Sequence, residues 1–394
     1  MEPDRISFDD TSIAFSSKSD KALKKMYLLF SSMNNNLLVK VGANIMKTSL
    51  KLGLPVKGII KFTVFEHFCG GETIENSQKT IEKLAKYNIG TILDYSVEGE
   101  KTEAGFEKTT KEILKTIDKA EGNRNFPFCV FKVTGIASAS LLEKVQLKKA
   151  LQAEEEKAFA RVKERVEWLC SAAHKAKVRI LADGEDSWIQ DVIDEMVYTM
   201  MQKYNIEQPI VFNTYQMYRK DMLQNLRKAF QDAVAHRYFL GAKLVRGAYM
   251  EKERERAGDM GYEDPIQVSK EATDDDYNKA LLFCIDNGQR LALCSGTHNE
   301  YSNYYLTVLM EKYNMKKDDE RVYFAQLYGM SDNISFTLAK AGYNVAKYVP
   351  YGPIEAVMPY LLRRAEENTS VGGQTSRELL LIKKELQRRK ADQS

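Results

Sequence analysis

A tyrosine, two adjacent arginines and two glutamates stand close together in the segment YLLRRAEEN, residues 360–368. Apolar residues around them recur at i, i+3 and i+4 spacing, which predicts a helix over residues 354–368 with one buried face. The opposite flank then carries four polar groups: Tyr360, Arg363, Arg364 and Glu367. Adjacent guanidinium groups suit bidentate binding of a carboxylate. On this segment alone a solvated flank is the simpler interpretation, because an exposed Arg–Glu pair contributes only about 0.3–0.5 kcal/mol.

More polar residues stand late in short apolar runs elsewhere in the chain. The runs lie at residues 91–96, 127–135, 178–185, 209–216, 241–249, 291–299, 321–330 and 345–352. A helix-patterned segment follows each run, and eight such β-then-α units predict a (β/α)8, TIM-like barrel. We expect an N-terminal helical arm over residues 1–87, the barrel over residues 88–385 and a C-terminal tail over residues 386–394. Helix 354–368 follows the last strand, so we expect it to cap the barrel mouth, the face at which the strands end.

The predicted strand ends bring charged and polar side chains to the mouth, where the reactive groups of such barrels sit. They are Asp94, Lys132, Asp183, Glu185, Asn213, Gln216, Lys243, Arg246, Tyr249, Thr297, His298, Asn299, Gln326 and Tyr348. The lysines and arginines here add to the two arginines of helix 354–368 and outweigh the acids considered with them. This excess of positive charge predicts an anionic ligand, such as a carboxylate or a pyrophosphate.

Several other kinds of site are not supported. There is no GxGxxG after a strand and no GxxxxGK[ST], so neither a Rossmann site nor a P-loop is predicted. The four histidines lack metal-ligand spacing, and no GxSxG occurs, so we expect no metal centre and no serine nucleophile. A net charge of +3 is too mild to suggest nucleic-acid binding. The acidic start MEPDRISFDD does not resemble a secretory signal, and no apolar run is long enough to span a membrane.

The segment from Lys21 to Phe65 contains eight lysines and no Asp, Glu or Arg. Amphipathic helices that pack on the core are the simpler interpretation of this pattern. The alternative is a cationic surface that contacts an anionic membrane.

Four segments together resemble the proline dehydrogenase family: KLVRGAY, THNE, KYVPYGP and YLLRRAEEN, in the order of that family's barrel. The similarity covers roughly residues 60–385 and is closest to the single-function form. It implies a distorted (β/α)8 barrel that binds FAD at its mouth without a Rossmann unit. The implied reaction is hydride transfer from L-proline to FAD, which gives Δ1-pyrroline-5-carboxylate, with electrons passed to a membrane quinone.

The resemblance also implies roles for individual residues. The groups nearest to the reaction are Lys132, Asp183 and Lys243. The substrate pocket would be lined by Lys132, Asp183, Leu244, Tyr249, Ile334, Tyr348, Tyr360, Arg363 and Arg364, with Glu72 as a gate that pairs with Arg363. The flavin would be held by Asn213, Lys243, Val245, Gly247, Lys270, Thr297, His298 and Glu367. Lys243 and Asn213 stand where many bacterial members carry Arg and Gln, and both replacements keep a hydrogen-bond donor. A phenol at Tyr348 crowds a hydroxylated ring and favours proline over hydroxyproline.

Other interpretations stay open at this point. One is hydroxyproline oxidation, and another is a Schiff-base lyase or aldolase that uses Lys132 or Lys243 as its nucleophile. The third is a protein that only binds a metabolite or docks on a membrane. We expect a cytoplasmic protein on the inner face of a bacterial membrane, or alternatively one at the mitochondrial inner membrane or in the matrix. Transient contact with pyrroline-5-carboxylate dehydrogenase is a further expectation.

Overall fold

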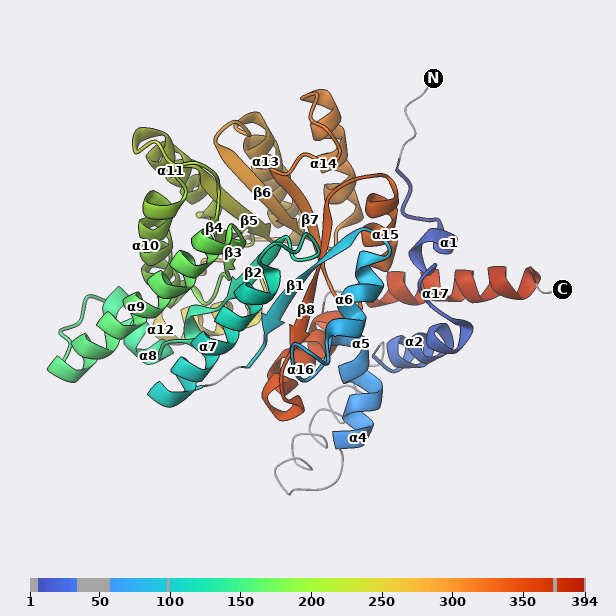
Figure 1. Ribbon diagram of the computed structural model, residues 1–394, viewed down its shortest axis with the longest axis horizontal. Coiled ribbons are helices and arrows are strands. Elements are labelled where there is room, and N and C mark those ends of the chain that lie inside the picture. Colours follow the sequence, from blue (N-terminus) through green and yellow to red (C-terminus); the bar gives the residue numbers. More distant parts are fainter. Residues whose placement is uncertain (1–5, 34–56, 98–99, 371–373, 393–394) are drawn as a thin grey trace. The chain divides into compact units, whose positions relative to one another are not determined.

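The computed structural model describes residues 6–33, 57–97, 100–370 and 374–392; the side chains of residues 57, 59, 365–370, 374 and 375 lie outside this description. Eight parallel strands form one sheet in the order β1-β8-β7-β6-β5-β4-β3-β2 (Figure 1). The strands are β1 Ile89–Tyr95, β2 Phe128–Phe131, β3 Arg179–Ala182, β4 Val211–Gln216, β5 Leu240–Val245, β6 Leu291–Gly296, β7 Val322–Leu327 and β8 Val345–Tyr351. This is the strand order of a (β/α)8 barrel, as the sequence predicts.

The chain divides into two compact units, which do not follow the predicted boundary at residue 87. Unit 1 comprises Met1–Glu98 with Gln326–Ser394, and unit 2 comprises Gly99–Ala325. The arm is therefore not separate from the last strand and the C-terminal helices. The predicted tail also differs, because helix α17 continues through Ala391.

Unit 2 holds strands β2 to β6 and most of β7, with helices on the outside of the sheet (Figure 1). The helices are α7 Glu103–Ala120, α8 Ala139–Gln146, α9 Ala153–Ala176, α10 Ser187–Tyr204, α11 Met222–Ala235, α12 Met250–Met260, α13 Lys270–Asp286 and α14 Glu300–Lys312, and Val133–Gly135 forms the 3₁₀ turn η2. Capping residues in the sequence determine where several of these helices begin. Ser269 caps α13 by accepting from the Ala272 N–H, and Asn299 caps α14 by accepting from the Ser302 N–H.

The sheet of unit 2 is strongly curved. Phe128 on β2 contacts Phe212 on β4 and Tyr323 on β7, with ring centroids 5.3 and 5.1 Å apart. The Arg179 guanidinium on β3 lies over the rings of both Phe128 and Tyr323. Strands β2 and β7 stand at opposite ends of this part of the sheet, so the sheet must bend round for their rings to meet, as barrel formation requires.

Unit 1 holds β1 paired in register with β8 and nine short or long helical segments among its described residues. They are α1 Thr11–Ala14, α2 Asp20–Met33, α4 Lys57–Ile60, the π-helical turn η1 Lys61–Phe65, α5 Glu66–Phe68, α6 Gln78–Ala85, α15 Asp332–Lys340, α16 Ile354–Ser370 and α17 Gln374–Ala391. Figure 1 shows α17 beside α2. Phe15, Phe30 and Ile382 belong to the buried apolar cluster that joins α1, α2 and α17. Burial of this apolar surface explains why the chain ends pack together.

Candidate active site

Three charged side chains meet at the ends of strands β2, β3 and β5 in unit 2. Asp183 accepts from the Lys132 Nζ at 2.5 Å through one carboxylate oxygen and from the Lys243 Nζ at 2.6 Å through the other. Asp183 and Lys243 are only 8% and 7% exposed. The structure therefore brings these three predicted residues together, while their roles in a reaction stay a prediction.

The cluster holds its carboxylate as an anion. Burial alone would raise the pKa of Asp183, but the ammonium groups of Lys132 and Lys243 outweigh it and hold that pKa well below its usual range. Two ammonium groups against one carboxylate leave an excess of positive charge. The cluster can therefore stabilise a neighbouring anion.

Glu185, two residues after Asp183, links three strand ends. Its carboxylate accepts from the Thr134 N–H at 3.0 Å and from the Thr134 hydroxyl. Its backbone carbonyl accepts from the Gln216 side-chain amide at 2.7 Å, and its N–H donates to Gln190 on α10. Burial raises the pKa of Glu185 to about 7, even though the bonds from Thr134 act in the opposite direction. The turn that follows Lys132 is thus fixed by a carboxyl group that titrates near neutrality.

Asn213 on β4 is not brought to the Lys132–Asp183–Lys243 cluster. Its side-chain amide donates to Asp194 on α10 at 2.8 Å, and its oxygen accepts from the Thr214 N–H. Gln216, at the end of the same strand, is the residue that bonds to the Glu185 carbonyl. The flavin contact of Asn213 stays a prediction.

The end of β5 turns sharply after Val245. Gly247 has a φ of +134°, and a Cβ at this position would lie 2.5 Å from the Tyr218 ring. Leu244 is completely buried, and the Val245 carbonyl accepts from the Met217 N–H. Tyr249 is half-buried at the start of α12. The backbone shape and the Tyr218 ring therefore require glycine at position 247. Its place near a cofactor stays a prediction.

Arg246, Thr297 and Lys270 belong to one network next to this turn. Arg246 donates to Asp274 at 2.6 Å and to the Thr297 hydroxyl at 2.5 Å, and Lys270 donates to the other oxygen of Asp274 at 2.5 Å. The Arg246 guanidinium also lies over the Tyr277 ring. Arg246 thus ties the residue after β5 to α13 and to the residue after β6, and its part in a cationic mouth stays a prediction. His298 follows Thr297 and is half-buried.

In unit 1, the polar flank of helix α16 is buried. Tyr360 and Arg364 are 6% and 8% exposed, and the guanidinium carbon of Arg364 lies 5.2 Å from the centre of the Tyr360 ring. Arg363 is half-buried. A solvated flank is therefore excluded for Tyr360 and Arg364. The side chain of Glu367 lies outside the described residues.

The remaining predicted residues of unit 1 are also placed. Tyr348 on β8 is 7% exposed, and Ile334 on α15 is completely buried. Glu72 accepts from the Lys61 Nζ at 2.5 Å. The predicted gate pairing of Glu72 with Arg363 stays a prediction.

Sequence reasoning missed Thr134 and the role of Lys347. Lys347 is completely buried on β8, where its ammonium group pairs with Asp332 at 3.0 Å. A lysine inside the apolar run VAKYVPY was the available signal. Among the described residues, no group of three or more His, Cys, Asp or Glu side chains is placed to hold a metal ion.

Comparison with known protein families gives a consistent picture. The family model described as proline dehydrogenase matches residues 77–377. Proline dehydrogenase 1, mitochondrial, of Dictyostelium discoideum is 32% identical, with 96% of this chain and 74% of that protein covered. Hydroxyproline dehydrogenase of Xenopus laevis is 30% identical, with 98% of this chain and 90% of that protein covered.

A solved structure shows the same fold. It is proline utilization A of Bdellovibrio bacteriovorus inactivated by N-propargylglycine, at a TM-score of 0.71 and 20% identity. The match covers 94% of this chain, which spans 40% of that longer chain. This likeness confirms the predicted fold class.

Proposed function

The chain belongs to the proline dehydrogenase family, and on this premise we propose that it oxidises L-proline to Δ1-pyrroline-5-carboxylate, the first step of proline catabolism. FAD is the proposed cofactor and a membrane quinone the proposed final electron acceptor. The observation that carries the proposal is the buried Lys132–Asp183–Lys243 cluster at the strand ends of unit 2.

The residues of unit 2 fit a flavin. Lys243 is buried and keeps its ammonium group beside Lys132 and Asp183, which suits a group that becomes negatively charged on reduction. Gly247 leaves room for close approach of another group to the backbone. The chemistry that FAD supplies when bound is acceptance of a hydride from a ring carbon of proline. We propose that it is held by Asn213, Lys243, Val245, Gly247, Lys270, Thr297, His298 and Glu367.

The substrate requires an anion-binding group and an apolar cover. We propose that Arg363 and Arg364 bind its carboxylate, with Lys132 as a further cation. The burial of Arg364 supports this role, because a charge-assisted hydrogen bond strengthens when water is excluded. We propose that the ring is covered by Asp183, Leu244, Tyr249, Ile334, Tyr348 and Tyr360, with Glu72 as the gate. Charged groups at one end of the substrate would fix the orientation of its reacting carbon.

The cationic surroundings also serve the ring nitrogen. Hydride leaves the neighbouring carbon most easily when this nitrogen is neutral, and nearby positive charge lowers the pKa of an ammonium group. Lys132 and Lys243 supply that charge, and Asp183 keeps both lysines in place.

The ion pairs disfavour the lyase alternative. A Schiff-base lysine must present a neutral amine to a carbonyl group. Lys132 and Lys243 instead each donate to the ionised carboxylate of Asp183, at 2.5 and 2.6 Å, so their nitrogens are engaged in these ion pairs. Sodium borohydride would therefore trap no substrate on either lysine.

Hydroxyproline is the second candidate substrate, because the Xenopus laevis relative carries that name and matches over nearly the whole chain. We favour proline because the Tyr348 phenol adds bulk to a buried position that would crowd a ring hydroxyl. The ratio of kcat/KM values for the two substrates decides between them.

We propose that the protein contacts a membrane peripherally to reach its quinone. In the described residues no helix has the length and apolar content to cross a bilayer. Lys21, Lys24 and Leu28 are exposed at i, i+3 and i+7 on α2, and Phe62 is 60% exposed beneath the Lys25 ammonium group. The lysine-rich segment predicted to form this surface extends into residues 34–56, which lie outside the described residues. The mitochondrial relative favours the inner mitochondrial membrane over a bacterial one as the location. Handover of product to pyrroline-5-carboxylate dehydrogenase stays a proposal.

The visible absorption spectrum tests the function directly. We expect the purified protein, incubated with FAD, to show a flavin band that bleaches on anaerobic addition of L-proline. The variant Arg364→Met tests the site, with Lys119→Met at an exposed position of α7 as its control. We expect Arg364→Met to keep the flavin band but to need about a hundredfold more L-proline for bleaching, because a charge-assisted pair is lost. Bleaching by hydroxyproline but not by L-proline would favour the second candidate, and absence of any flavin would overturn the proposal.

A further inference from the structure

Four ionisable side chains from four separate segments form a buried cluster in unit 1. Lys18 from the α1–α2 turn and Lys347 from β8 each pair with Asp332, the first residue of α15, at 3.0 Å. Glu378 on α17 is 3% exposed and accepts from the Ser331 N–H at 2.5 Å. Two lysines and two carboxylates balance in charge, which makes the burial of Asp332, Lys347 and Glu378 and the partial burial of Lys18 tolerable.

The electrostatics of this cluster depend on Lys18. Burial alone would raise the pKa of Asp332, but Lys18 and then Lys347 outweigh it and hold the pKa well below its usual range. Burial, reinforced by the charge of Lys18, lowers the pKa of the neighbouring His67 to about 4, so its ring is neutral near pH 7. The His67 Nε2 can then donate to the Gly329 carbonyl, 2.7 Å away.

These groups hold the connection between β7 and α15 against β8. The Lys347 ammonium group donates to the carbonyls of Leu327 and Met330 as well as pairing with Asp332. The Tyr328 N–H donates to the Tyr348 carbonyl at 2.8 Å. Gly329 and Ser331 have φ values of +80° and +50°, so this connection has a specific backbone shape that the surrounding bonds must maintain.

Strand β8 and helix α15, which these bonds hold in place, carry two residues of the proposed substrate pocket. Tyr348 follows Lys347 on β8, and successive strand residues point to opposite faces. Lys347 therefore fixes the strand from one face while Tyr348 is presented on the other. Ile334 lies two residues after Asp332 on α15.

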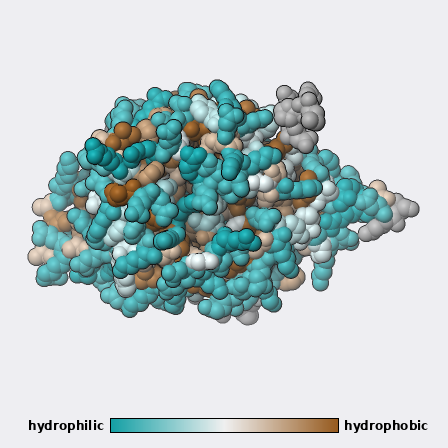
Figure 2. Space-filling view, turned by 45° about the horizontal axis from the view of Figure 1, so that its top comes forward, coloured by the Kyte–Doolittle hydropathy of each residue, from teal (hydrophilic) through white to brown (hydrophobic). Residues whose placement is uncertain are grey.

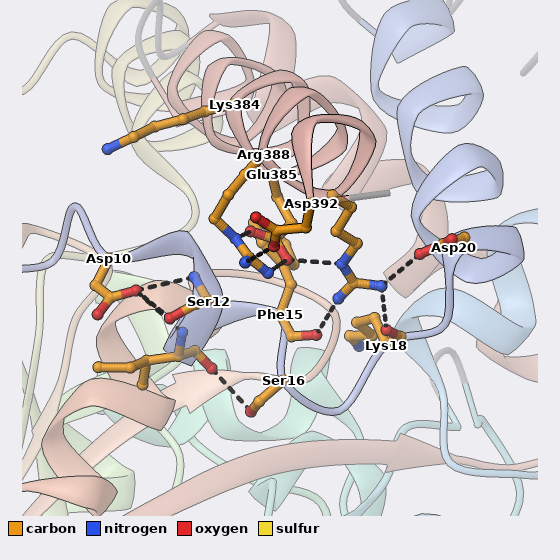
Figure 3. A network of polar contacts seen from close by, with 12 residues as sticks. Asp10, Ser12, Phe15, Ser16, Lys18, Asp20, Lys384, Glu385, Arg388 and Asp392 are labelled. Carbon is orange, nitrogen blue, oxygen red and sulfur yellow. Dashed lines mark hydrogen bonds and ion pairs between the residues drawn. The ribbon is translucent and has the colours of Figure 1, made fainter. Parts of the chain in front are cut away.

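Lys18 is itself held by the C-terminal helix. Arg389 on α17 donates to the backbone carbonyls of Lys18 and Phe15 and pairs with Asp20 at 2.7 Å. Glu385, completely buried, accepts from Arg388 and Arg389 (Figure 3). The α1–α2 turn is thereby fixed at the position from which Lys18 reaches Asp332.

We propose that Lys18 is a positioning residue for substrate selection: through Asp332 and Lys347 it fixes the shape of β8 and of the β7–α15 connection, and so the placement of Tyr348. The inference rests on the proposed function, because Tyr348 is assigned to the substrate through it. According to this inference, the α1–α2 segment contributes to substrate affinity as well as to packing against α17.

Steady-state kinetics of Lys18→Met test this role against Lys79→Met, a matched change at an exposed position of α6. We expect Lys18→Met to raise the KM for L-proline about tenfold while kcat stays within about twofold, because misplacement affects substrate fit before chemistry. The preference for L-proline over hydroxyproline should fall in parallel. Lys18→Arg should restore both values, since a guanidinium group can pair with Asp332, and Lys79→Met should match the wild type.

A double-mutant cycle keeps the test independent of folding. Since Lys18 acts through Asp332, Lys18→Met should change KM by less than about twofold in an Asp332→Asn background. A lower Tm of Lys18→Met with unchanged KM and substrate preference would overturn the positioning role and leave the proposed function intact. Absence of L-proline turnover in the wild type would overturn the proposed function, and this role with it.

Discussion

At the scale of single residues, Asp183 and Glu185 show how different surroundings shift the pKa values of two neighbouring carboxyl groups in opposite directions. Asp183 is paired with two ammonium groups, and these hold its pKa well below the usual range. Glu185 is buried, with its carboxylate bonded to Thr134 and its backbone carbonyl to Gln216. Burial dominates there and raises its pKa to about 7. One group is therefore a permanent anion, and the other changes charge near neutral pH.

The substitution Glu185→Gln should change how stability depends on pH. The folded-state pKa of Glu185, about 7, lies above its ordinary value of 4.5. Its contribution is fully present below about pH 4.5 and is lost as pH rises through about 7. The amide that replaces the carboxyl group cannot ionise, so from about pH 5 to about pH 8 the variant should gain about 3 kcal/mol relative to the wild type.

The measurement is the free energy of unfolding of both proteins in urea across that pH range. Any change in packing caused by the amide adds a constant offset, whereas the proton linkage changes with pH. A difference between the two proteins that stays constant from about pH 5 to about pH 8 would refute the raised pKa.

At the scale of elements, a short turn and a helix each depend on more than their own propensities. The turn after β5 needs a residue without Cβ at Gly247, because φ is +134° and the Tyr218 ring stands in the way. Helix α16 exposes Glu355 and Pro359 but buries residues on both sides of that narrow stripe, including Tyr360 and Arg364. Over residues 354–364, whose side chains are described, so narrow an exposed stripe means that the polar groups on the buried side serve a purpose other than solubility.

Gly247→Ala should destabilise the protein and weaken its hold on FAD. The added methyl group meets the Tyr218 ring and forces an unfavourable φ, at a cost of about 1–3 kcal/mol. Gly258→Ala is the control, because Gly258 lies in α12 with nothing within 4 Å of an added Cβ. Alanine there should stabilise the helix by about 0.5–1 kcal/mol.

Thermal unfolding and flavin retention after gel filtration distinguish the two variants. The expected order of Tm, from highest to lowest, is Gly258→Ala, wild type, Gly247→Ala. Equal Tm and equal flavin content in all three proteins would show that the β5 turn relaxes freely around a side chain.

At the scale of the whole chain, each unit has its own polar cluster. Unit 2 carries the Lys132–Asp183–Lys243 cluster, and unit 1 carries the buried flank of α16 and the charge-balanced group around Asp332. The face drawn in Figure 2 is largely hydrophilic, with apolar side chains scattered in small groups. The exposed lysines and Leu28 of α2 are the surface feature from which membrane contact is proposed.

Vesicle sedimentation tests that contact. We expect the protein to sediment with vesicles that contain anionic lipid and to be released as salt is raised to about 0.5 M, because salt screens surface charge. Lys21→Glu with Lys24→Glu should reduce binding at least about thirtyfold, since each lysine near the surface contributes about 1 kcal/mol and the introduced glutamates add repulsion. Lys108→Glu with Lys119→Glu, at two exposed positions of α7, is the charge-matched control. Equal losses in both double variants would indicate a nonspecific effect of net charge.

The sequence by itself determined the repeating architecture and several of its chemical groups. Each of the eight apolar runs overlaps one of the eight strands, although β1 and β5 begin two residues and one residue before their runs, because buried parallel strands must be apolar along their length. Lys132, Asp183 and Lys243 could be grouped in advance because polar residues late in such runs converge where the strands end. Some predicted runs extend past the C-terminal end of their strand. Residues 246–249, for example, follow β5 rather than belonging to it.

Tertiary structure decided which polar groups meet. Asn213 bonds to α10 while Gln216, three residues later, reaches Glu185, a difference set by strand orientation and helix packing. Arg246 joins a network with Asp274 and Thr297, although its position after a strand resembles that of Lys132. The pairing of Lys18 with Asp332 links residues more than 300 positions apart. No local pattern encodes such a pair, because it depends on how the two ends of the chain bury their apolar surfaces together.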